Sequence, residues 1–152
     1  MDGAIAMRTW LIAALAGLSF SAVADTVNID AATLERLRAE GVPVVDIRTA
    51  PEWQQTGVVP GSHLLTFFDE RGEAEPEAFL ARLQAIAKPG QPVALICRSG
   101  NRTTVVSRFL TEQVGYARVY NVEGGIRAWQ KAERPVVKAT EAASTCARAS
   151  AC

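Results

Sequence analysis

The sequence predicts an α/β domain in which a parallel sheet of about five strands lies between helices on both faces. Short apolar runs alternate with segments whose apolar residues recur at helical spacing. The clearest run, Pro92–Ile96, is apolar throughout, as is typical of a strand whose two faces are both buried. Repeated strand–helix units favour parallel strands that are joined by crossover helices.

Local sequence signals predict the strands and helices of the first half of the chain. We expect strands at residues 27–29, 42–47 and 62–66. Asp30 is a suitable N-cap for a helix over residues 31–40, and Gly41 is a suitable stop for it. The segment 51–61 ends in a Pro-Gly turn, and we expect all of it to be a loop.

The second half of the chain continues the alternation. Pro76 suits the first turn of a helix that ends near Lys88. A second helix follows Cys97 and carries apolar residues at helical spacing as far as Val114. We expect a last strand at residues 117–120 and a last helix at 125–131, with its tryptophan packed inward.

Composition excludes several classes of protein. The chain has 152 residues, which suits one domain. Sixteen basic and sixteen acidic residues balance, which argues against a nucleic-acid binder held by bulk positive charge. Three cysteines are too few for a disulfide scaffold, and a single histidine excludes a multi-histidine metal site. We therefore expect neither a metal nor another cofactor.

Residues 1–24 resemble a signal peptide. No charge lies between Arg8 and Asp25, and the apolar run ends in Ala22-Val23-Ala24, a small-x-small cleavage signature. The run is shorter than the roughly 20 apolar residues of a membrane span. A buried helix and an uncleaved anchor are the alternatives. We expect cleavage near Ala24-Asp25, a periplasmic or secreted mature chain without a stable membrane span, and a translation start at Met1 or Met7.

The mature chain then divides into a domain over residues 25–137 and a tail over 138–152. The tail is rich in Ala, Ser and Thr, and we expect it to be poorly ordered. Its Cys146 and Cys152 are close enough for a small disulfide in an oxidising compartment. Two other readings stay open, namely a pair of unstructured thiols and a resolving thiol that takes sulfur from Cys97.

Cys97 carries the strongest chemical signal in the sequence. It follows the buried strand directly, at the edge where ligands bind in open α/β sheets. The loop after it can direct backbone N–H groups at the sulfur, and the following helix and two arginines add positive charge. We therefore expect a thiol pKa below the roughly 8.5 of free cysteine, although a buried structural cysteine is the alternative. The candidate donor-binding residues are Arg98, Ser99, Gly100, Asn101, Arg102 and Thr103.

Four motifs occur in order along the chain, namely Val45–Arg48 with Glu52-Trp53, Gly57–Ser62, Cys97–Thr103, and Val119–Ile126 with Trp129. Together they give the chain a resemblance to the rhodanese family of sulfurtransferases, over roughly Val27 to Lys131. The chain departs from the family pattern at Val58, where histidine is common.

The resemblance implies a single-domain thiosulfate sulfurtransferase that works by double displacement. The Cys97 thiolate would take the outer sulfur of thiosulfate or a similar donor as a persulfide. A thiophilic acceptor such as cyanide or a thiol would then remove it, and a protein acceptor is left open. Arg98 or Arg102 would hold the anionic donor.

Three further residues are candidates for supporting roles. Asp46 lies at the end of its strand and can orient groups of the loop. Arg48 and Glu52 can form an ion pair that holds the neighbouring segment in place. Ion pairs in such networks often only maintain shape.

Two alternative functions remain at the level of sequence. Cysteine phosphatases and arsenate reductases also place a cysteine in an anion-binding loop that an arginine closes. Their usual spacing is Cys-x5-Arg, whereas Cys97 and Arg102 give Cys-x4-Arg, and Ile96 stands where tyrosine phosphatases usually have histidine. The other alternative is a sulfur carrier or binding module that serves one protein partner.

Overall fold

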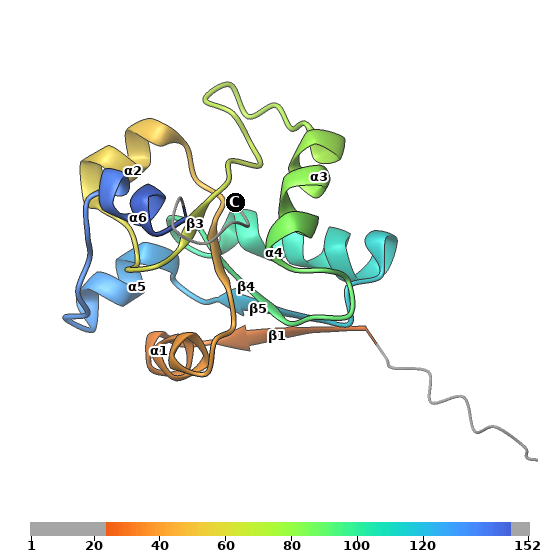
Figure 1. Ribbon diagram of the computed structural model, residues 1–152, viewed down its shortest axis with the longest axis horizontal. Coiled ribbons are helices and arrows are strands. Elements are labelled where there is room, and N and C mark those ends of the chain that lie inside the picture. The colour runs from red at the N-terminus through yellow and green to blue at the C-terminus, as the bar shows by residue number, and fades with distance from the viewer. Residues whose placement is uncertain (1–23, 147–152) are drawn as a thin grey trace, which may run out of the picture.

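The computed structural model describes residues 24–146 and contains a five-stranded sheet in which every pairing is parallel (Figure 1). The spatial order of the strands is β1-β5-β4-β2-β3. This confirms the expected α/β fold with a parallel sheet of about five strands. The strands are β1 Asp25–Ile29, β2 Val44–Asp46, β3 His63–Leu64, β4 Val93–Ile96 and β5 Arg118–Val122.

Six α-helices connect and cover these strands in the described part of the chain (Figure 1). Helix α4 runs directly into a π-helical turn, Leu110–Val114, so that the predicted helix after Cys97 reaches its expected end. The helices are α1 Ala31–Ala39, α2 Ala50–Thr56, α3 Pro76–Ile86, α4 Asn101–Phe109, α5 Gly125–Lys131 and α6 Ala139–Cys146.

Successive side chains of a strand point to opposite faces of the sheet, and a hydrophobic core lies on each face. In β4, Val93 and Leu95 belong to the core that α3 and α4 cover, whereas Ala94 and Ile96 belong to the core under α1 and α5. All four residues are buried, which explains why this strand is apolar throughout. Trp129 of α5 is fully buried in the second core, as expected.

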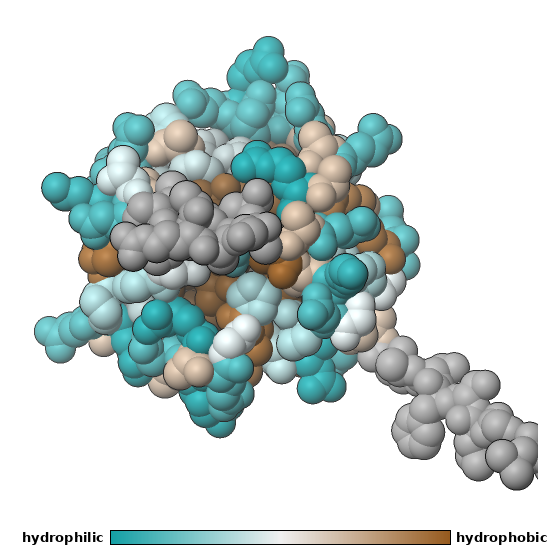
Figure 2. Space-filling view, viewed as in Figure 1, coloured by the Kyte–Doolittle hydropathy of each residue, from teal (hydrophilic) through white to brown (hydrophobic). Residues whose placement is uncertain are grey.

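The outer surface is mostly polar. Figure 2 shows hydrophilic side chains projecting over the visible face, with hydrophobic residues in the recesses between them. Among the described residues, Val105 and Val136 are the large hydrophobic side chains that stay exposed. No helix within residues 24–146 is long and apolar enough to cross a membrane.

The segment 51–61 is not a loop throughout, because helix α2 occupies its first half. Pro51 lies in the first turn, where a fixed φ suits a helix and no N–H is needed. The carboxylate of Glu52 accepts a hydrogen bond from the backbone N–H of Thr49 at 3.1 Å, which caps the helix. The proline therefore starts a helix here and does not prevent one.

The expectation of a poorly ordered tail from residue 138 is also wrong in part. Helix α6 spans residues 139–146, lies against β3, and buries Ala142. An antiparallel bridge between Val58 and Val137 brings the chain to this position. The side chain of Cys146, all of Cys152 and the predicted signal peptide before Ala24 lie outside the described residues.

A close backbone contact joins the Cys97 loop to the start of α5. The N–H of Ile126 donates to the carbonyl oxygen of Cys97 at 2.8 Å. Gly125 has φ of +55°, and a Cβ atom at this position would lie 2.3 Å from the same oxygen. Glycine is therefore required here both by backbone conformation and by space.

We predict that Gly125→Ala destabilises the domain more than Gly41→Ala does. Gly41 also has positive φ, +87°, but a Cβ atom there meets nothing within 4 Å. Gly41→Ala, the control, should lower the free energy of unfolding by about 1–2 kcal/mol through backbone strain. Gly125→Ala should lower it by roughly 1–3 kcal/mol more, because the added methyl group overpacks the contact. Urea unfolding followed by tryptophan fluorescence measures both, and equal losses would contradict the close contact.

Candidate active site

Cys97 lies just beyond the carboxyl end of β4, in a loop of only a few residues. Gly100 is the N-cap of α4 with φ of +94°, so the helix begins at Asn101. A Cβ atom at Gly100 would approach the backbone nitrogen of Gly124 to 3.2 Å. The early helix start turns the backbone N–H groups of the loop back toward the sulfur.

The sulfur of Cys97 is buried and hydrogen-bonded. The residue is 1% exposed, the N–H of Gly100 donates to Sγ at 3.1 Å, and Oγ1 of Thr103 lies 3.5 Å from it. Burial raises the pKa of the thiol, but hydrogen bonds from the Thr103 side chain and from the N–H groups of Thr103, Ser99 and Gly100 outweigh it. The net pKa of Cys97 is lower than usual, in the expected direction.

A second layer of hydrogen bonds holds the carbonyl of Gly100, the residue whose N–H donates to the sulfur. The Thr104 hydroxyl donates to the carbonyl oxygen of Gly100 at 2.8 Å, and the Thr103 hydroxyl lies between this oxygen, at 3.0 Å, and the sulfur. The side-chain amide of Asn121, in β5, donates to the Thr104 hydroxyl at 3.1 Å. The sequence offered no signal for Thr104 or Asn121, because their contact spans two separate elements.

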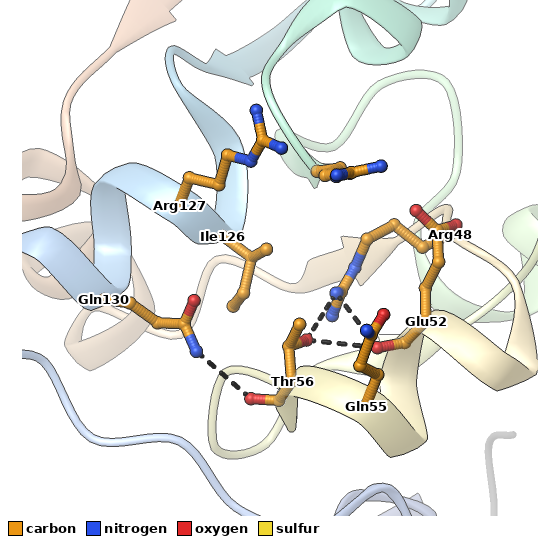
Figure 3. Close-up of a pocket in the computed structure, with 8 residues that line it drawn as sticks. Arg48, Glu52, Gln55, Thr56, Ile126, Arg127 and Gln130 are labelled. Carbon is orange, nitrogen blue, oxygen red and sulfur yellow. Dashed lines mark hydrogen bonds between the residues drawn. The ribbon is translucent and has the colours of Figure 1, made fainter.

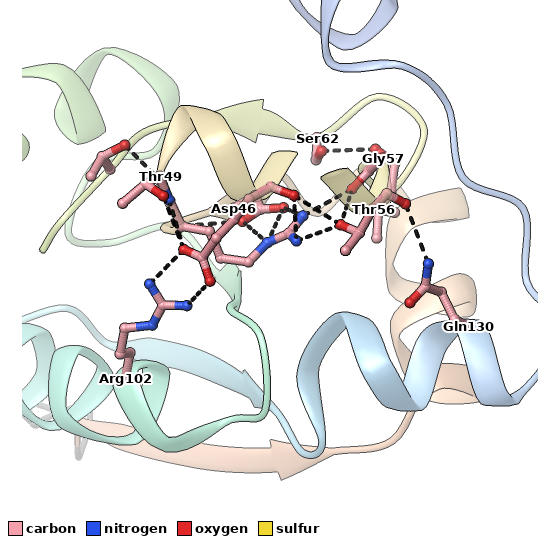
Figure 4. A network of polar contacts seen from close by, with 11 residues as sticks. Asp46, Thr49, Thr56, Gly57, Ser62, Arg102 and Gln130 are labelled. Atoms are coloured by element: carbon pink, nitrogen blue, oxygen red, sulfur yellow. Dashed lines mark hydrogen bonds and ion pairs between the residues drawn. The ribbon is translucent and has the colours of Figure 1, made fainter. Parts of the chain in front are cut away.

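Arg102 is engaged in an ion pair with Glu52. Its two terminal nitrogens lie 2.9 and 2.6 Å from the two carboxylate oxygens, in a bidentate arrangement (Figure 4). Partial burial raises the pKa of Glu52, but hydrogen bonds from Arg102 and Thr49 outweigh it and lower the pKa to about 2. The sequence paired Glu52 with Arg48, and the structure corrects this.

Arg48 instead pairs with Asp46 inside the protein. Nη2 of Arg48 lies 2.7 Å from Oδ2 of Asp46, and both side chains are at most 1% exposed. The guanidinium also donates to the Thr56 hydroxyl at 2.7 Å and to the Gly57 carbonyl at 3.0 Å (Figure 4). Asp46 therefore holds Arg48 and, through it, the end of α2, and it makes no hydrogen bond to the Cys97 loop.

Arg98 is the arginine of the loop that stays free. Its side chain is exposed and has no hydrogen bond or ion pair with any residue within 24–146. It borders two depressions, one between α2 and α5 (Figure 3) and one toward Asp69 and Glu70. Of the two arginines that were candidates for holding an anionic donor, only Arg98 has an uncommitted guanidinium.

The remaining candidates differ in their surroundings. Thr103 contacts the sulfur, whereas Ser99 and Asn101 line the depression toward Asp69. His63, the single histidine of the chain, is half-buried and borders a different depression beside α3. No group of three or more potential metal ligands occurs within residues 24–146.

Comparisons with known proteins agree with this geometry. The family model of the rhodanese-like domain matches residues 30–132. The chain is 34% identical over 102 residues to thiosulfate sulfurtransferase GlpE of Pseudoalteromonas translucida, covering 67% of this chain and 86% of that protein. It is 35% identical over 112 residues to a sulfurtransferase of Allochromatium vinosum, covering 72% and 94%.

Solved structures resemble the domain as well. The rhodanese-like domain protein from Staphylococcus aureus is 25% identical, with a TM-score of 0.53 and coverage of 68% of this chain and 90% of that one. Rv0390 from M. tuberculosis has a TM-score of 0.62 and coverage of 76% and 98%, at 21% identity. The second likeness concerns the fold alone.

We predict that Cys97 is alkylated by iodoacetamide with a pH midpoint below the roughly 8.5 of free cysteine. In Thr103→Val the midpoint should rise by about 1 pH unit, because the thiolate loses a hydrogen bond while the thiol loses little. Thr33→Val, on α1, is the control and should leave the midpoint unchanged. The rate is followed by mass spectrometry of the peptide that contains Cys97. A midpoint that does not respond to Thr103→Val would contradict the assigned cause.

Proposed function

The chain belongs to the rhodanese-like domain family and is a rhodanese-type sulfurtransferase, and we propose that Cys97 carries the transferred sulfur as a persulfide. The donor is thiosulfate or a similar sulfane compound, and the acceptor is cyanide or a thiol. The observation that carries this proposal is the Cys97 sulfur, which receives the Gly100 N–H at 3.1 Å and has a lowered pKa. A lowered pKa raises the fraction of thiolate at a given pH, and the thiolate is the nucleophilic form of cysteine.

In the first half-reaction the Cys97 thiolate attacks the outer sulfur of thiosulfate. A bond forms between Sγ and that sulfur, the sulfur–sulfur bond of the donor breaks, and sulfite leaves with the electron pair. Arg98 is suited to hold the sulfonate end, because its guanidinium has no other partner within the described residues. The N–H groups that stabilise the thiolate are placed to stabilise the persulfide anion as well.

In the second half-reaction the acceptor attacks the outer sulfur of the persulfide. The bond to Sγ breaks, and its electron pair returns to Cys97 as the stabilised thiolate. No redox change of the protein is needed, because each step exchanges one sulfur bond for another. This cycle is covalent catalysis in two steps and predicts ping-pong kinetics.

Two observations make a phosphatase or arsenate reductase the weaker alternative. The loop between Cys97 and α4 is short, because the helix begins at Asn101. The closing arginine of the Cys-x4-Arg spacing, Arg102, is held by Glu52 through two hydrogen bonds. A sulfur carrier that serves one protein partner remains the second alternative, and turnover with small thiols distinguishes it from an enzyme.

We predict that thiosulfate adds about 32 Da to the intact protein, that cyanide removes this mass again, and that Cys97→Ser shows no gain. Cys146→Ser/Cys152→Ser is the matched control and should retain both the gain and the turnover rate. A gain that persists in Cys97→Ser would place the sulfur elsewhere. No gain on a fully reduced wild-type chain would exclude thiosulfate as the donor.

Export is the second part of the proposal, with cleavage near Ala24-Asp25 and a periplasmic or secreted mature chain. Strand β1 begins at Asp25, so that removal of the preceding residues would leave the sheet intact. We predict that expression of the full chain in a Gram-negative host yields a periplasmic protein whose mass corresponds to a first residue of Asp25. Replacing the two alanines of the cleavage signature, Ala22 and Ala24, by Arg should retain the precursor mass. An uncleaved wild-type chain in the cytoplasm would contradict export.

A further inference from the structure

We propose that the groove between α2 and α5 binds the carboxylates of the sulfur acceptor, and that the preferred acceptors are thiols carrying two carboxylates. This inference rests on the proposed function, because it names the substrate class of the second half-reaction. The groove has a volume of about 240 Å³ and adjoins the Cys97 loop (Figure 3). It is lined by Arg48, Glu52, Gln55, Thr56, Arg98, Ile126, Arg127 and Gln130.

Two positive charges in this groove lack a counter-ion among residues 24–146. Four charged residues line it, but Arg48 is neutralised by Asp46 and Glu52 by Arg102. Arg98 and Arg127 remain, and neither side chain has a hydrogen bond or ion pair within the described part of the chain. Two uncompensated guanidinium groups at one depression favour a ligand with two negative charges.

The groove borders the loop that carries the nucleophile, because Arg98, the residue after Cys97, lines it. The N–H groups of Ile126 and Arg127 donate to the carbonyl oxygens of Cys97 and Arg98, at 2.8 and 3.4 Å. The start of α5, which carries Arg127, is therefore held against the backbone of the Cys97 loop. Figure 3 shows Arg127 and Gln130 on α5 and Gln55 and Thr56 on α2, on opposite sides of the groove.

The size and the lining of the groove favour a small organic thiol over an inorganic ion. A groove of about 240 Å³ has more room than one small ion requires. Ile126 contributes an apolar surface for a carbon chain, and the amides of Gln55 and Gln130 offer hydrogen-bonding groups. Each guanidinium can hold one carboxylate through two hydrogen bonds.

The chemical step is the attack of this thiol on the persulfide. The acceptor thiolate, RS⁻, attacks the outer sulfur of Cys97–S–SH, and a new sulfur–sulfur bond forms as RS–SH. The bond to Sγ breaks and its electron pair returns to Cys97, while the proton stays on the transferred sulfur. Atoms and charge balance, and no external oxidant or reductant takes part.

The test compares two thiols in the second half-reaction alone. Wild-type protein is loaded with thiosulfate, freed of donor, and mixed with mercaptosuccinate, a dicarboxylate, or with neutral 2-mercaptoethanol. The loss of about 32 Da gives the rate constant for each thiol. In Arg127→Gln we expect the ratio of the mercaptosuccinate rate constant to the 2-mercaptoethanol rate constant to fall about tenfold, because one bidentate contact is lost.

Lys131→Gln is the matched control, because Lys131 is an exposed cation on the same helix but does not line the groove. Its ratio should change less than twofold. An equal fall of the ratio in both variants would mean that overall positive charge causes the preference, and it would contradict a carboxylate site at Arg127. If Arg127→Gln instead slows persulfide formation from thiosulfate by the same factor, the groove serves the donor and the proposal is wrong.

A binding measurement tests the groove without sulfur transfer. Succinate, which has two carboxylates and no thiol, should raise the melting temperature of the wild-type protein above that in sodium chloride of equal ionic strength. The rise should be absent in Arg127→Gln and retained in Lys131→Gln. No rise in the wild-type protein would overturn the carboxylate site. If thiosulfate leaves the mass of the protein unchanged, the proposed donor chemistry is wrong. The succinate experiment still shows whether the groove binds carboxylates.

Discussion

The hydrogen bond from the Gly100 N–H to the Cys97 sulfur is the contact on which the site depends. Burial raises the pKa of Cys97 and so disfavours the thiolate. The backbone N–H donors of the loop must therefore be held in place to stabilise the charged sulfur. The Gly100 carbonyl is held by two threonine hydroxyls, and the carbonyls of Cys97 and Arg98 receive N–H groups from α5. The loop is therefore held from both sides.

The sheet brings these elements together. Strands β2 and β4 are parallel neighbours, so their carboxyl ends meet at one edge, and the chain after β2 enters α2 beside the Cys97 loop. Helix α2 places Glu52 against Arg102, and the buried Asp46–Arg48 pair holds the end of the same helix. Glu52 thus contacts Arg102, next to the Cys97 loop, although the two residues are fifty positions apart in the sequence.

The arginines around the site divide into two groups by their partners. Arg48 and Arg102 are neutralised by carboxylates, and truncating a partner in such a pair leaves an uncompensated charge, at a high cost where the pair is fully buried. Arg98 and Arg127 have no such partner among the described residues, so their charge remains available to anionic ligands. The paired arginines therefore have a structural role, and the two arginines without a carboxylate partner have the proposed ligand-binding role.

The sequence by itself determined the parallel sheet, the position of Cys97 after the buried strand, and the direction of its pKa shift, because apolar runs and a strand–loop–helix junction are local patterns. Only the tertiary structure decided which carboxylate pairs with which arginine, because Glu52 and Arg102 lie on different helices and the Asp46–Arg48 pair forms where both side chains are buried. Helix α2 was missed although Thr49-x-x-Glu52 with Pro51 is a local start signal, because the helix is short and buries no residue that would mark an apolar face. Helix α6 was missed because it depends on packing against β3, which residue patterns alone do not show.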